Sequence, residues 1–452
     1  MSAESEALPA TSPVLLPVAL DQTYDYLARP GVDLAPGAFI LVPFGPQTRI
    51  GVVWDRVVGL SDKPVNVPPV PHLSMRFAEW IAKYTLSPLG MVLRMMMGAQ
   101  AAFEPQKPRT GVRAAEGAHL PPRMTPARLK AMETAGDGLI RAKSALAAEA
   151  GVSSGVVDGL VQAGLLVEVL IPERSYRAPN PDFAATTFGE HQIPAVETLR
   201  AAVDGRNFSV TLLDGVTGSG KTEVYFEAVA RTLAQGRQVV IMLPEIALTS
   251  QFMDRFTRRF GAAPVEWHSA LSGPERGRIW RAAATGGARV VVGARSALFL
   301  PYENLGLIIV DEEHDPGFKQ DDRVHYQARD MAVVRGNLGR ILVILASATP
   351  SIESHVNARS AKYRHIVLPG RFSGVEMPEV SAIDLRRHPP DRGRWLSPPL
   401  VQAMVEARGR GPQSLLFLNR RGYAPLTLCR AAGHRFACPQ CTPGLAGHRI
   451  RR

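Results

Sequence analysis

The chain has 452 residues, which is too long for one ordinary domain and long enough for about three domains with separate cores. Hydrophobic residues make up 46% of it and no apolar run approaches the roughly 18 residues that a bilayer span needs, so we expect no membrane segment. The formal net charge of +11 favours a polyanionic partner, either nucleic acid or an anionic membrane surface. A well-solvated basic surface is the plain alternative.

Cysteine usage and the first residues bear on the compartment. Residues 1–12 are acidic and lack an apolar stretch, so no signal peptide is predicted. The three cysteines, Cys429, Cys438 and Cys441, all lie near the C-terminal end, which excludes a disulfide framework spread through the fold. These observations predict a cytoplasmic protein.

From residue 13 to residue 55, short β-branched and aromatic stretches alternate with turn residues. This pattern predicts strands over 23–27, 39–42 and 49–54 in a small β-barrel or sandwich. A helix is expected over 77–84. The stretch from 103 to 123, rich in Pro, Gly and Arg, is interpreted as a linker.

Three short helices and a strand are predicted next. Thr125 and Pro126 form a helix start, with Thr as N-cap and Pro at the first helical position. A second helix is expected near 142–150, a third after the capping run 151–154 and reaching about residue 163, and then a strand over 165–169. This order outlines a winged helix, a fold that often places its third helix in a DNA groove. A helical spacer that only separates its neighbours is the alternative.

Beyond residue 188, apolar runs alternate with helical segments, which predicts a doubly wound parallel sheet of the α/β class. Buried parallel strands are continuous apolar runs. Five such runs are 211–213, 239–243, 290–292, 307–310 and 341–345. The predicted fold is therefore multidomain: a β-rich N-terminal domain, a winged helix and an α/β P-loop lobe of the RecA-like kind.

A phosphate-binding loop is the strongest signal in the sequence, because it lies between a predicted strand and a predicted helix, as the pattern requires. Its residues are Gly215, Val216, Thr217, Gly218, Ser219, Gly220, Lys221 and Thr222. Glycines let backbone N–H groups converge on phosphates, and the N-terminus of the following helix adds about half a positive charge. Lys221 is expected to reach the β and γ phosphates, and the Thr222 hydroxyl to hold Mg²⁺.

Two further motifs follow apolar strands. At the carboxyl end of the 307–310 strand, Asp311 can hold Mg²⁺ and Glu312 can polarise the attacking water. His314 either couples the state of the γ-phosphate to the next motif or packs locally. After the 341–345 strand, Ser347 and Thr349 can exchange hydrogen-bond partners between motor states. In this order the motifs mark the DExH class of nucleic-acid motors.

Taken together, the motifs resemble those of the primosomal replication-restart helicase family PriA, also called primosomal protein N′, over nearly all of the chain. The resemblance rests on the runs 213–225, 243–249, 293–297, 311–315, 326–330 and 418–422. It implies an ATP-dependent 3′-5′ DNA helicase of superfamily 2 that recognises stalled forks and initiates primosome assembly. Its cofactors would be ATP and Mg²⁺.

The resemblance also implies two binding roles for residues before the lobe. Tyr24, Asp25 and Tyr26 resemble a pocket that captures the 3′ end of a leading strand, by base stacking and a hydrogen bond from the 3′-hydroxyl. Taken alone, the two tyrosines favour the packing face of a strand. Gln192 resembles a glutamine that reads the edge of adenine.

Further contacts with single-stranded DNA are implied within the lobe. Thr249 and Arg295 belong to motifs that would line the single-strand track. The segment 316–326, with Phe318, Lys319 and Tyr326, resembles an aromatic-rich segment that links DNA contact to ATP hydrolysis. Stacking there would contribute about 1 to 3 kcal/mol per base. A flexible surface loop is the alternative.

Near its C-terminal end the chain departs from the family, whose zinc module has eight cysteines that bind two zinc ions. Here alanine replaces the partner of Cys429, whereas Cys438 and Cys441 keep their spacing. A structural zinc site takes four ligands, so two zinc ions are not expected to be held in the usual way. His434 and His448 could complete one improvised site.

The second motor lobe is also expected to be incomplete, through truncation or frameshift near Gly433. Motors of this superfamily use arginines of the second lobe to stabilise charge on the transferred phosphoryl group. We therefore expect the chain to bind DNA and Mg-ATP but to unwind DNA poorly or not at all.

The predicted domains are a 3′-end-binding domain (1–105), a winged helix (106–178), helicase lobe 1 (179–372), the start of lobe 2 (373–428) and a partial cysteine-rich zinc module (429–452). Expected partners are DNA forks, single-stranded DNA, primosome and helicase-loading proteins and single-strand-binding protein, with no membrane. Two alternatives stay open: an ATP-independent scaffold that binds fork DNA, and an RNA helicase of superfamily 2.

Overall fold

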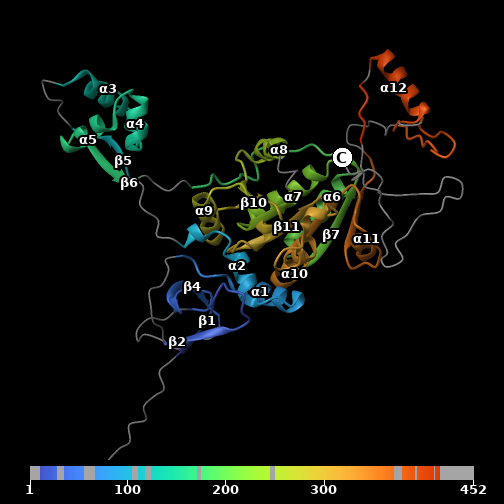
Figure 1. Cartoon of the computed structure of the whole chain (residues 1–452), viewed down its shortest axis with the longest axis horizontal. Coiled ribbons are helices and arrows are strands. Elements are labelled where there is room, and N and C mark those ends of the chain that lie inside the picture. Colours follow the sequence, from blue (N-terminus) through green and yellow to red (C-terminus); the bar gives the residue numbers. More distant parts are fainter. Residues whose placement is uncertain are drawn as a thin grey trace, which may run out of the picture. The chain divides into compact units, whose positions relative to one another are not determined.

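The computed structural model describes residues 11–27, 35–54, 67–103, 110–117, 124–170, 175–244, 250–370, 379–391, 394–411 and 413–417 (Figure 1). Its backbone forms two compact units, Met1–Val375 and Glu376–Arg452. In the described part of the second unit lies α12 (Pro398–Arg410), which begins with proline and ends at Gly411 in the left-handed conformation. Among the described residues, no helix is both long and apolar enough to cross a membrane.

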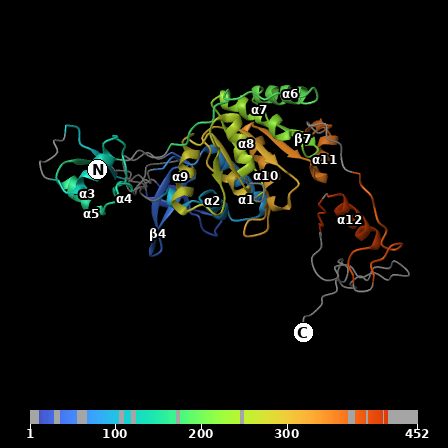
Figure 2. The same ribbon diagram turned by 90° about the horizontal axis from the view of Figure 1, so that it is seen from above.

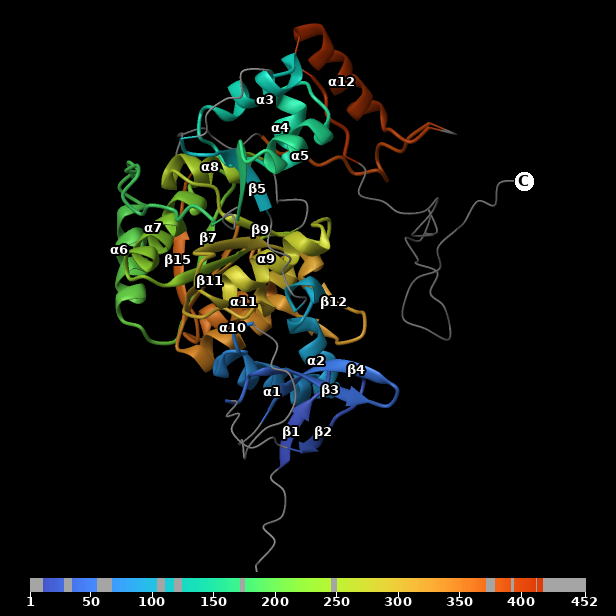
Figure 3. The same cartoon turned by 90° about the vertical axis from the view of Figure 1, so that its left-hand side faces the viewer.

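A four-stranded antiparallel sheet opens the first unit, and Figure 3 shows it with the two helices that follow. In spatial order its strands are β2 (Thr23–Leu27), β1 (Thr11–Leu15), β4 (Gln47–Val53) and β3 (Phe39–Phe44). Alternation along the strands buries both faces. Val14, Val42 and Val53 form a small core on one face, whereas Leu15 and Val52 lie in the large core that also contains the helices α1 (His72–Thr85) and α2 (Leu89–Met96).

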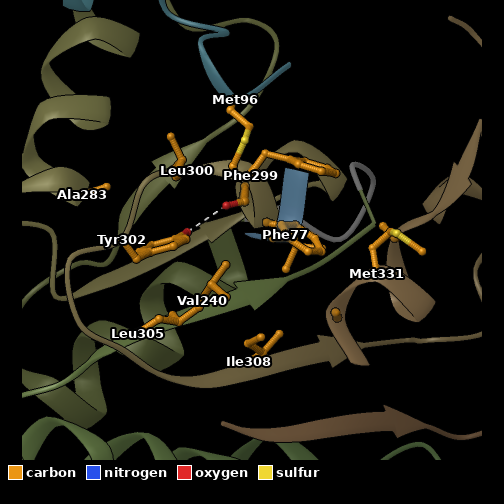
Figure 4. Packing of buried hydrophobic residues seen from close by; sticks show 14 of the residues in the cluster. Phe77, Met96, Val240, Ala283, Phe299, Leu300, Tyr302, Leu305, Ile308 and Met331 are labelled. Carbon is orange, nitrogen blue, oxygen red and sulfur yellow. Dashed lines mark hydrogen bonds between the residues drawn. The ribbon is translucent and has the colours of Figure 1, made fainter. Parts of the chain in front are cut away.

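That large core continues from α1 and α2 into the parallel sheet, as Figure 4 shows for Phe77 and Met96 beside Phe299. The rings of Phe77 and Phe299 stack with centroids 5.7 Å apart. Polar contacts cross the same junction, because the Trp280 indole N–H donates to the carbonyl of Met96 at 2.9 Å. Arg335 is fully buried there and donates to the Ser74 hydroxyl at 3.2 Å.

Residues 110–170 hold a small helical group. Its helices are α3 (Pro126–Ala135), α4 (Lys143–Glu149) and α5 (Ser154–Gln162), and its strands β5 (Thr110–Ala114) and β6 (Leu166–Leu170) pair antiparallel. The Thr125 hydroxyl caps α3 by accepting from the Arg128 N–H. The interpretation of 103–123 as a linker was wrong in part, since β5 lies within it and finds its partner far along the chain. The winged-helix assignment stays a prediction.

The central element is a seven-stranded parallel sheet (Figure 1). In spatial order its strands are β15 (Arg364–Leu368), β7 (Ser209–Gly215), β14 (Leu342–Ser347), β11 (Leu305–Asp311), β8 (Gln238–Met242), β10 (Val290–Gly293) and β9 (Val265–Trp267). The five predicted strands form its middle, and the prediction of a parallel α/β sheet is confirmed.

Helices cover both faces of this sheet (Figure 2). On one face lie α6 (Ile193–Asp204), α7 (Lys221–Ala234) and α8 (Ser250–Phe260). The other face packs against α9 (Gly273–Ala284) and α10 (Ala328–Gly339). Because β7, β14 and β11 are parallel neighbours, the loops at their carboxyl ends meet at one edge.

The remaining short elements lie around that edge or beside the core. They are the 3₁₀ turns η1 (Gln100–Ala102), η3 (Arg295–Phe299) and η4 (Pro316–Phe318), the two-residue strands β12 (Lys319–Gln320) and β13 (Tyr326–Gln327), and the helix α11 (Ile352–Arg359). The strands β12 and β13 pair antiparallel. They make the segment between β11 and α10 a small hairpin, which the sequence did not predict.

Candidate nucleotide-binding site

The phosphate-binding loop connects β7 to α7 and is shaped by glycines. Gly218 and Gly220 both have φ of +84°, in the left-handed region that favours glycine. A Cβ atom on Gly220 would lie 2.2 Å from the amide nitrogen of Gln192, so a side chain there would collide as well as strain the backbone. Lys221 then begins α7, and the free N–H groups of the first helical turn face the loop.

The side chains of Lys221 and Gln192 hold this loop in place. Lys221 is 8% exposed, and its ammonium donates to the carbonyl of Gly215 at 2.6 Å. The Gln192 amide accepts from the Gly189 N–H at 3.0 Å and donates to the Ser219 carbonyl at 2.8 Å. Both polar ends of Gln192 are therefore bound to backbone, where the sequence predicted contact with an adenine edge.

Asp311 ends β11 and lies across the site from the loop. The Tyr225 hydroxyl donates to one carboxylate oxygen at 2.9 Å, and the Glu312 N–H donates to the other at 3.0 Å. Burial raises the pKa of Asp311 to about 6, which the nearby Glu312 carboxylate reinforces and the Tyr225 hydrogen bond opposes. Glu312 itself has φ of +49°, an unusual conformation for a residue with a side chain.

The predicted coupling residues form one hydrogen-bonded chain. His314 Nδ1 lies 2.8 Å from the Ser347 hydroxyl, which also accepts from the Thr349 N–H at 3.0 Å. His314 Nδ1 is 3.7 Å from a Glu312 carboxylate oxygen. The structure thus joins the loop after β11 to the loop after β14, with Thr349 contributing its backbone N–H.

A cavity of about 430 Å³ lies between the phosphate-binding loop, Gln192 and the carboxylates of Asp311 and Glu312. It is lined by Thr186, Thr187, Gln192, Thr217, Gly218, Gly220, Lys221, Thr222, Glu223, Arg255, Asp311 and Glu312. The sequence interpretation missed Thr186, Thr187 and Arg255, which pairs with Glu223 at 2.6 Å. It also missed Tyr225, for which a signal existed: four residues after Lys221, it lies on the same side of α7.

The residues fit a magnesium nucleotide. Among the described residues, no group of three or more His, Cys, Asp or Glu side chains could hold a metal ion by itself. Mg²⁺ usually binds to one or two protein oxygens together with phosphates and water, so such a group is not required. The Thr222 hydroxyl and the Asp311 carboxylate, which both line the cavity, would supply such oxygens. The three zinc-ligand candidates, Cys429, Cys438 and Cys441, lie outside the described residues.

The segment predicted to stack on bases is packed inward. Phe318 is 1% exposed and Tyr326 6% exposed, and both rings belong to the large core, so neither presents a face to a base in this structure. Lys319 is exposed. Arg295 donates to the carbonyls of Gly317 and Lys319, at 3.2 and 2.7 Å. Thr249, the other predicted track residue, lies outside the described residues.

The tyrosines of the N-terminal motif are likewise set by packing. Tyr24 meets Phe44 edge to face with ring centroids 5.3 Å apart, and the Tyr26 hydroxyl donates to the Pro43 carbonyl at 2.8 Å. Asp25, between them, is exposed. The two rings therefore serve the small core, and the carboxylate is free to meet a partner from solution.

A second cavity, of about 640 Å³, lies in the same domain between the β3–β4 hairpin and the end of α2. Its lining includes the guanidinium groups of Arg49 and Arg94 and the amides of Gln47 and Gln100, and no Asp or Glu is among the described residues that form it. The Arg49 Nε is buried without a hydrogen-bond partner among the described residues. This cavity suits an anion.

Family models match the two regions that carry these sites. The model of the DEAD/DEAH box helicase matches residues 191–357, and that of the 3′DNA-binding domain (3′BD) matches residues 13–98. With the loop, the carboxylates after β11 and the parallel sheet, these matches define a P-loop helicase lobe that follows a DNA-binding domain.

Individual relatives indicate a more specific group within the P-loop helicases. Replication restart protein PriA of Rickettsia prowazekii is 47% identical over 97% of this chain and 58% of its own length, and that of Haemophilus influenzae is 35% identical over 95% and 61%. Over nearly all of its length the chain is similar to replication restart protein PriA, and it spans about three fifths of the length of these relatives. Among solved structures, the Hef helicase domain of Pyrococcus furiosus is 21% identical over 38% of this chain and 37% of its own, with a TM-score of 0.29.

Proposed function

We propose that the chain is the nucleotide-binding and DNA-binding part of a helicase of replication restart, which uses Mg-ATP and binds forked DNA. One observation carries the proposal: Lys221 and Asp311 line a single cavity, from the two loops that grip phosphates and metal in such motors. The DNA-binding domain match at residues 13–98 and the net charge of +11 support DNA as the partner.

The predicted site residues, together with Tyr225, take roles that their positions support. The Lys221 ammonium exchanges the Gly215 carbonyl for the β and γ phosphates. Thr222 and Asp311 hold Mg²⁺, which neutralises charge on the phosphates when bound. Glu312 polarises the attacking water, and Tyr225 keeps the Asp311 carboxylate oriented. Gln192 fixes the loop through Ser219.

DNA would be met by cations on and beside the β12–β13 hairpin and by the N-terminal domain. Lys319 and Arg295 lie on the segment after β11 and on η3, and Asp25 stands ready to accept a hydrogen bond from a 3′-hydroxyl. Single-strand-binding protein and the helicase-loading proteins of the primosome are the proposed protein partners. Replication forks of bacteria lie in the cytoplasm, which is the compartment that this function implies.

The test uses the full chain with a fluorescent ATP analogue and a DNA fork that carries a free 3′ end. Mg²⁺-dependent binding of the analogue should weaken by about 10- to 150-fold in Lys221→Ala, the loss expected for hydrogen bonds to a charged group.

Three results would contradict the proposal in different ways. Fork affinity without any nucleotide binding would favour an ATP-independent scaffold. Preference for an RNA of matched shape would favour an RNA helicase. Nucleotide affinity unchanged in Lys221→Ala would remove the assigned role of the loop.

A further inference from the structure

Glu313 directly follows Asp311 and Glu312, which line the nucleotide cavity, but does not line it itself. Its side chain is fully buried and accepts four hydrogen bonds. The donors are Arg329 Nη1 at 3.2 Å, the Ser351 N–H at 2.7 Å, the Ser351 hydroxyl at 3.0 Å and the Ser354 hydroxyl at 2.9 Å. A buried carboxylate with this many partners has one well-defined position.

On the nucleotide side, Glu313 is linked through the backbone to residues that line the cavity or lie beside it. It is the direct neighbour of Glu312, and its own N–H donates to the Ala346 carbonyl at the end of β14, at 3.1 Å. The next residue, His314, contacts Ser347. A shift of Glu312 toward bound nucleotide would therefore move Glu313 with it.

On the other side, Glu313 controls the start of α10 through Arg329. Arg329 is 6% exposed and is the second residue of α10. This helix directly follows β13, one strand of the hairpin that carries Lys319 and Tyr326. That hairpin is tied together by the Tyr326 hydroxyl, which donates to the Gln320 side chain at 3.1 Å, and to η3 by Arg295. Arg329 thus connects the buried carboxylate to the segment that offers cations to DNA.

We propose that Glu313 is a positioning residue that transmits nucleotide occupancy to the DNA-facing hairpin, through Arg329, and to the start of α11, through Ser351 and Ser354. The inference rests on the proposed function, since it assumes that both ligands bind. Its physical basis is geometric. The loop after β11, the start of α10 and the start of α11 all meet at the Glu313 carboxylate, so none of these segments can move without the others.

The experiment measures coupling between the two ligands on the full chain. Affinity for a single-stranded oligonucleotide is measured with and without a non-hydrolysable Mg-ATP analogue, and the ratio is the coupling factor. A factor of about 5 or more, in either direction, is expected for the unaltered chain. In Glu313→Gln it should fall to less than about twofold, because the amide has one acceptor oxygen and carries no charge for Arg329. Each affinity measured alone should stay within about threefold.

Glu227 offers a matched control. It is also a buried glutamate, 3% exposed, and it pairs with two arginines, Arg200 and Arg259, between α6, α7 and α8. Glu227→Gln should lower the melting temperature much as Glu313→Gln does, yet leave the coupling factor unchanged. A purely structural role for Glu313 would make the two variants alike in both measurements.

Glu313→Gln leaves Arg329 buried without its charged partner, which can prevent folding. The double variant Glu313→Gln with Arg329→Gln removes both charges and gives the second measurement. Full coupling in either folded variant overturns the inference. An unaltered chain that binds both ligands without coupling also overturns it but leaves the proposed function standing, whereas failure to bind nucleotide at all refutes the proposed function first.

Discussion

The nucleotide edge of the parallel sheet and the four-stranded N-terminal sheet place their polar groups by different means. At the nucleotide edge, backbone conformation does the placing: Gly218 and Gly220 in the left-handed region, and Asp311 at a strand end. In the N-terminal sheet, packing fixes the positions of the polar groups: the Tyr24 ring packs against Phe44, and the Tyr26 hydroxyl donates to the Pro43 carbonyl. A motif at parallel strand ends therefore predicts where functional atoms lie, whereas a motif inside an antiparallel strand predicts only which face each residue shares.

Asp311→Asn tests the nucleotide edge most severely. The pKa of Asp311 is raised from 3.8 to about 6, so its contribution to stability is fully present below about pH 4 and lost as the pH rises through 6. At pH 8 the ionised carboxylate costs about 3 kcal/mol, at 1.36 kcal/mol per pKa unit. Asparagine should raise the free energy of unfolding by up to about that amount at pH 8 and by less at pH 5, as measured with urea.

The same carboxylate sets a pH dependence for the ligand. Mg²⁺ binds the ionised form, so the affinity of the unaltered chain for the Mg²⁺ nucleotide should fall as the pH drops below about 6. Asparagine should weaken that affinity most above pH 6, where Asp311 is ionised in the unaltered chain, and should remove this dependence. A stability gain of equal size at pH 5 and pH 8 would show that Asp311 ionisation is not its source.

Gly220→Ala tests whether backbone conformation governs the loop. The new Cβ meets the Gln192 amide in a left-handed conformation, so nucleotide affinity should fall at least about tenfold, or about 1.4 kcal/mol. Gly236→Ala is the control, since Gly236 has φ of +73° but its added Cβ would approach only Arg289, at 3.8 Å. Equal nucleotide affinities for the two variants would mean that the side chains of the loop, and not its backbone conformation, govern nucleotide binding.

Arg49→Gln and Arg94→Gln test the basic cavity of the N-terminal domain. If each guanidinium contacts one DNA phosphate, each variant should lower the salt dependence of fork binding by about 1 in the log–log slope. Lys83→Gln is the control, because Lys83 lines a cavity that also contains Asp21 and Glu79. An unchanged slope in both arginine variants would mean that DNA does not enter this cavity.

Tyr26→Phe carries the smallest expected effect. It removes the hydrogen bond to the Pro43 carbonyl and should lower the free energy of unfolding by about 1 kcal/mol. Fork affinity should stay within about twofold, measured by fluorescence anisotropy. A marked loss of affinity with no loss of stability would instead assign the hydroxyl to DNA, and the contrast between the two sheets would disappear.

What the sequence could predict follows the same division. The strand 23–27 and the five middle strands of the parallel sheet were predicted from local patterns, because alternation and apolar runs report burial directly. Strands β9 and β15 were missed because edge strands are short or partly exposed, and β5 because its partner β6 lies about 55 residues away. At the site, the loop and carboxylate positions were predictable, and the spacing of Tyr225 from Lys221 was a usable signal. The hydrogen-bond partners of Glu313, in contrast, come from segments that no local pattern connects.

The shared core beneath α1 and α2 has a thermodynamic consequence. Trp280 donates a hydrogen bond to the Met96 carbonyl, and Arg335 donates one to the Ser74 hydroxyl. A single apolar cluster extends from the N-terminal helices to the parallel sheet. Regions joined in this way melt cooperatively, so calorimetry should record one transition for them rather than two. Excising residues 13–98 would uncover that apolar surface, and the fragment would aggregate unless the surface were redesigned.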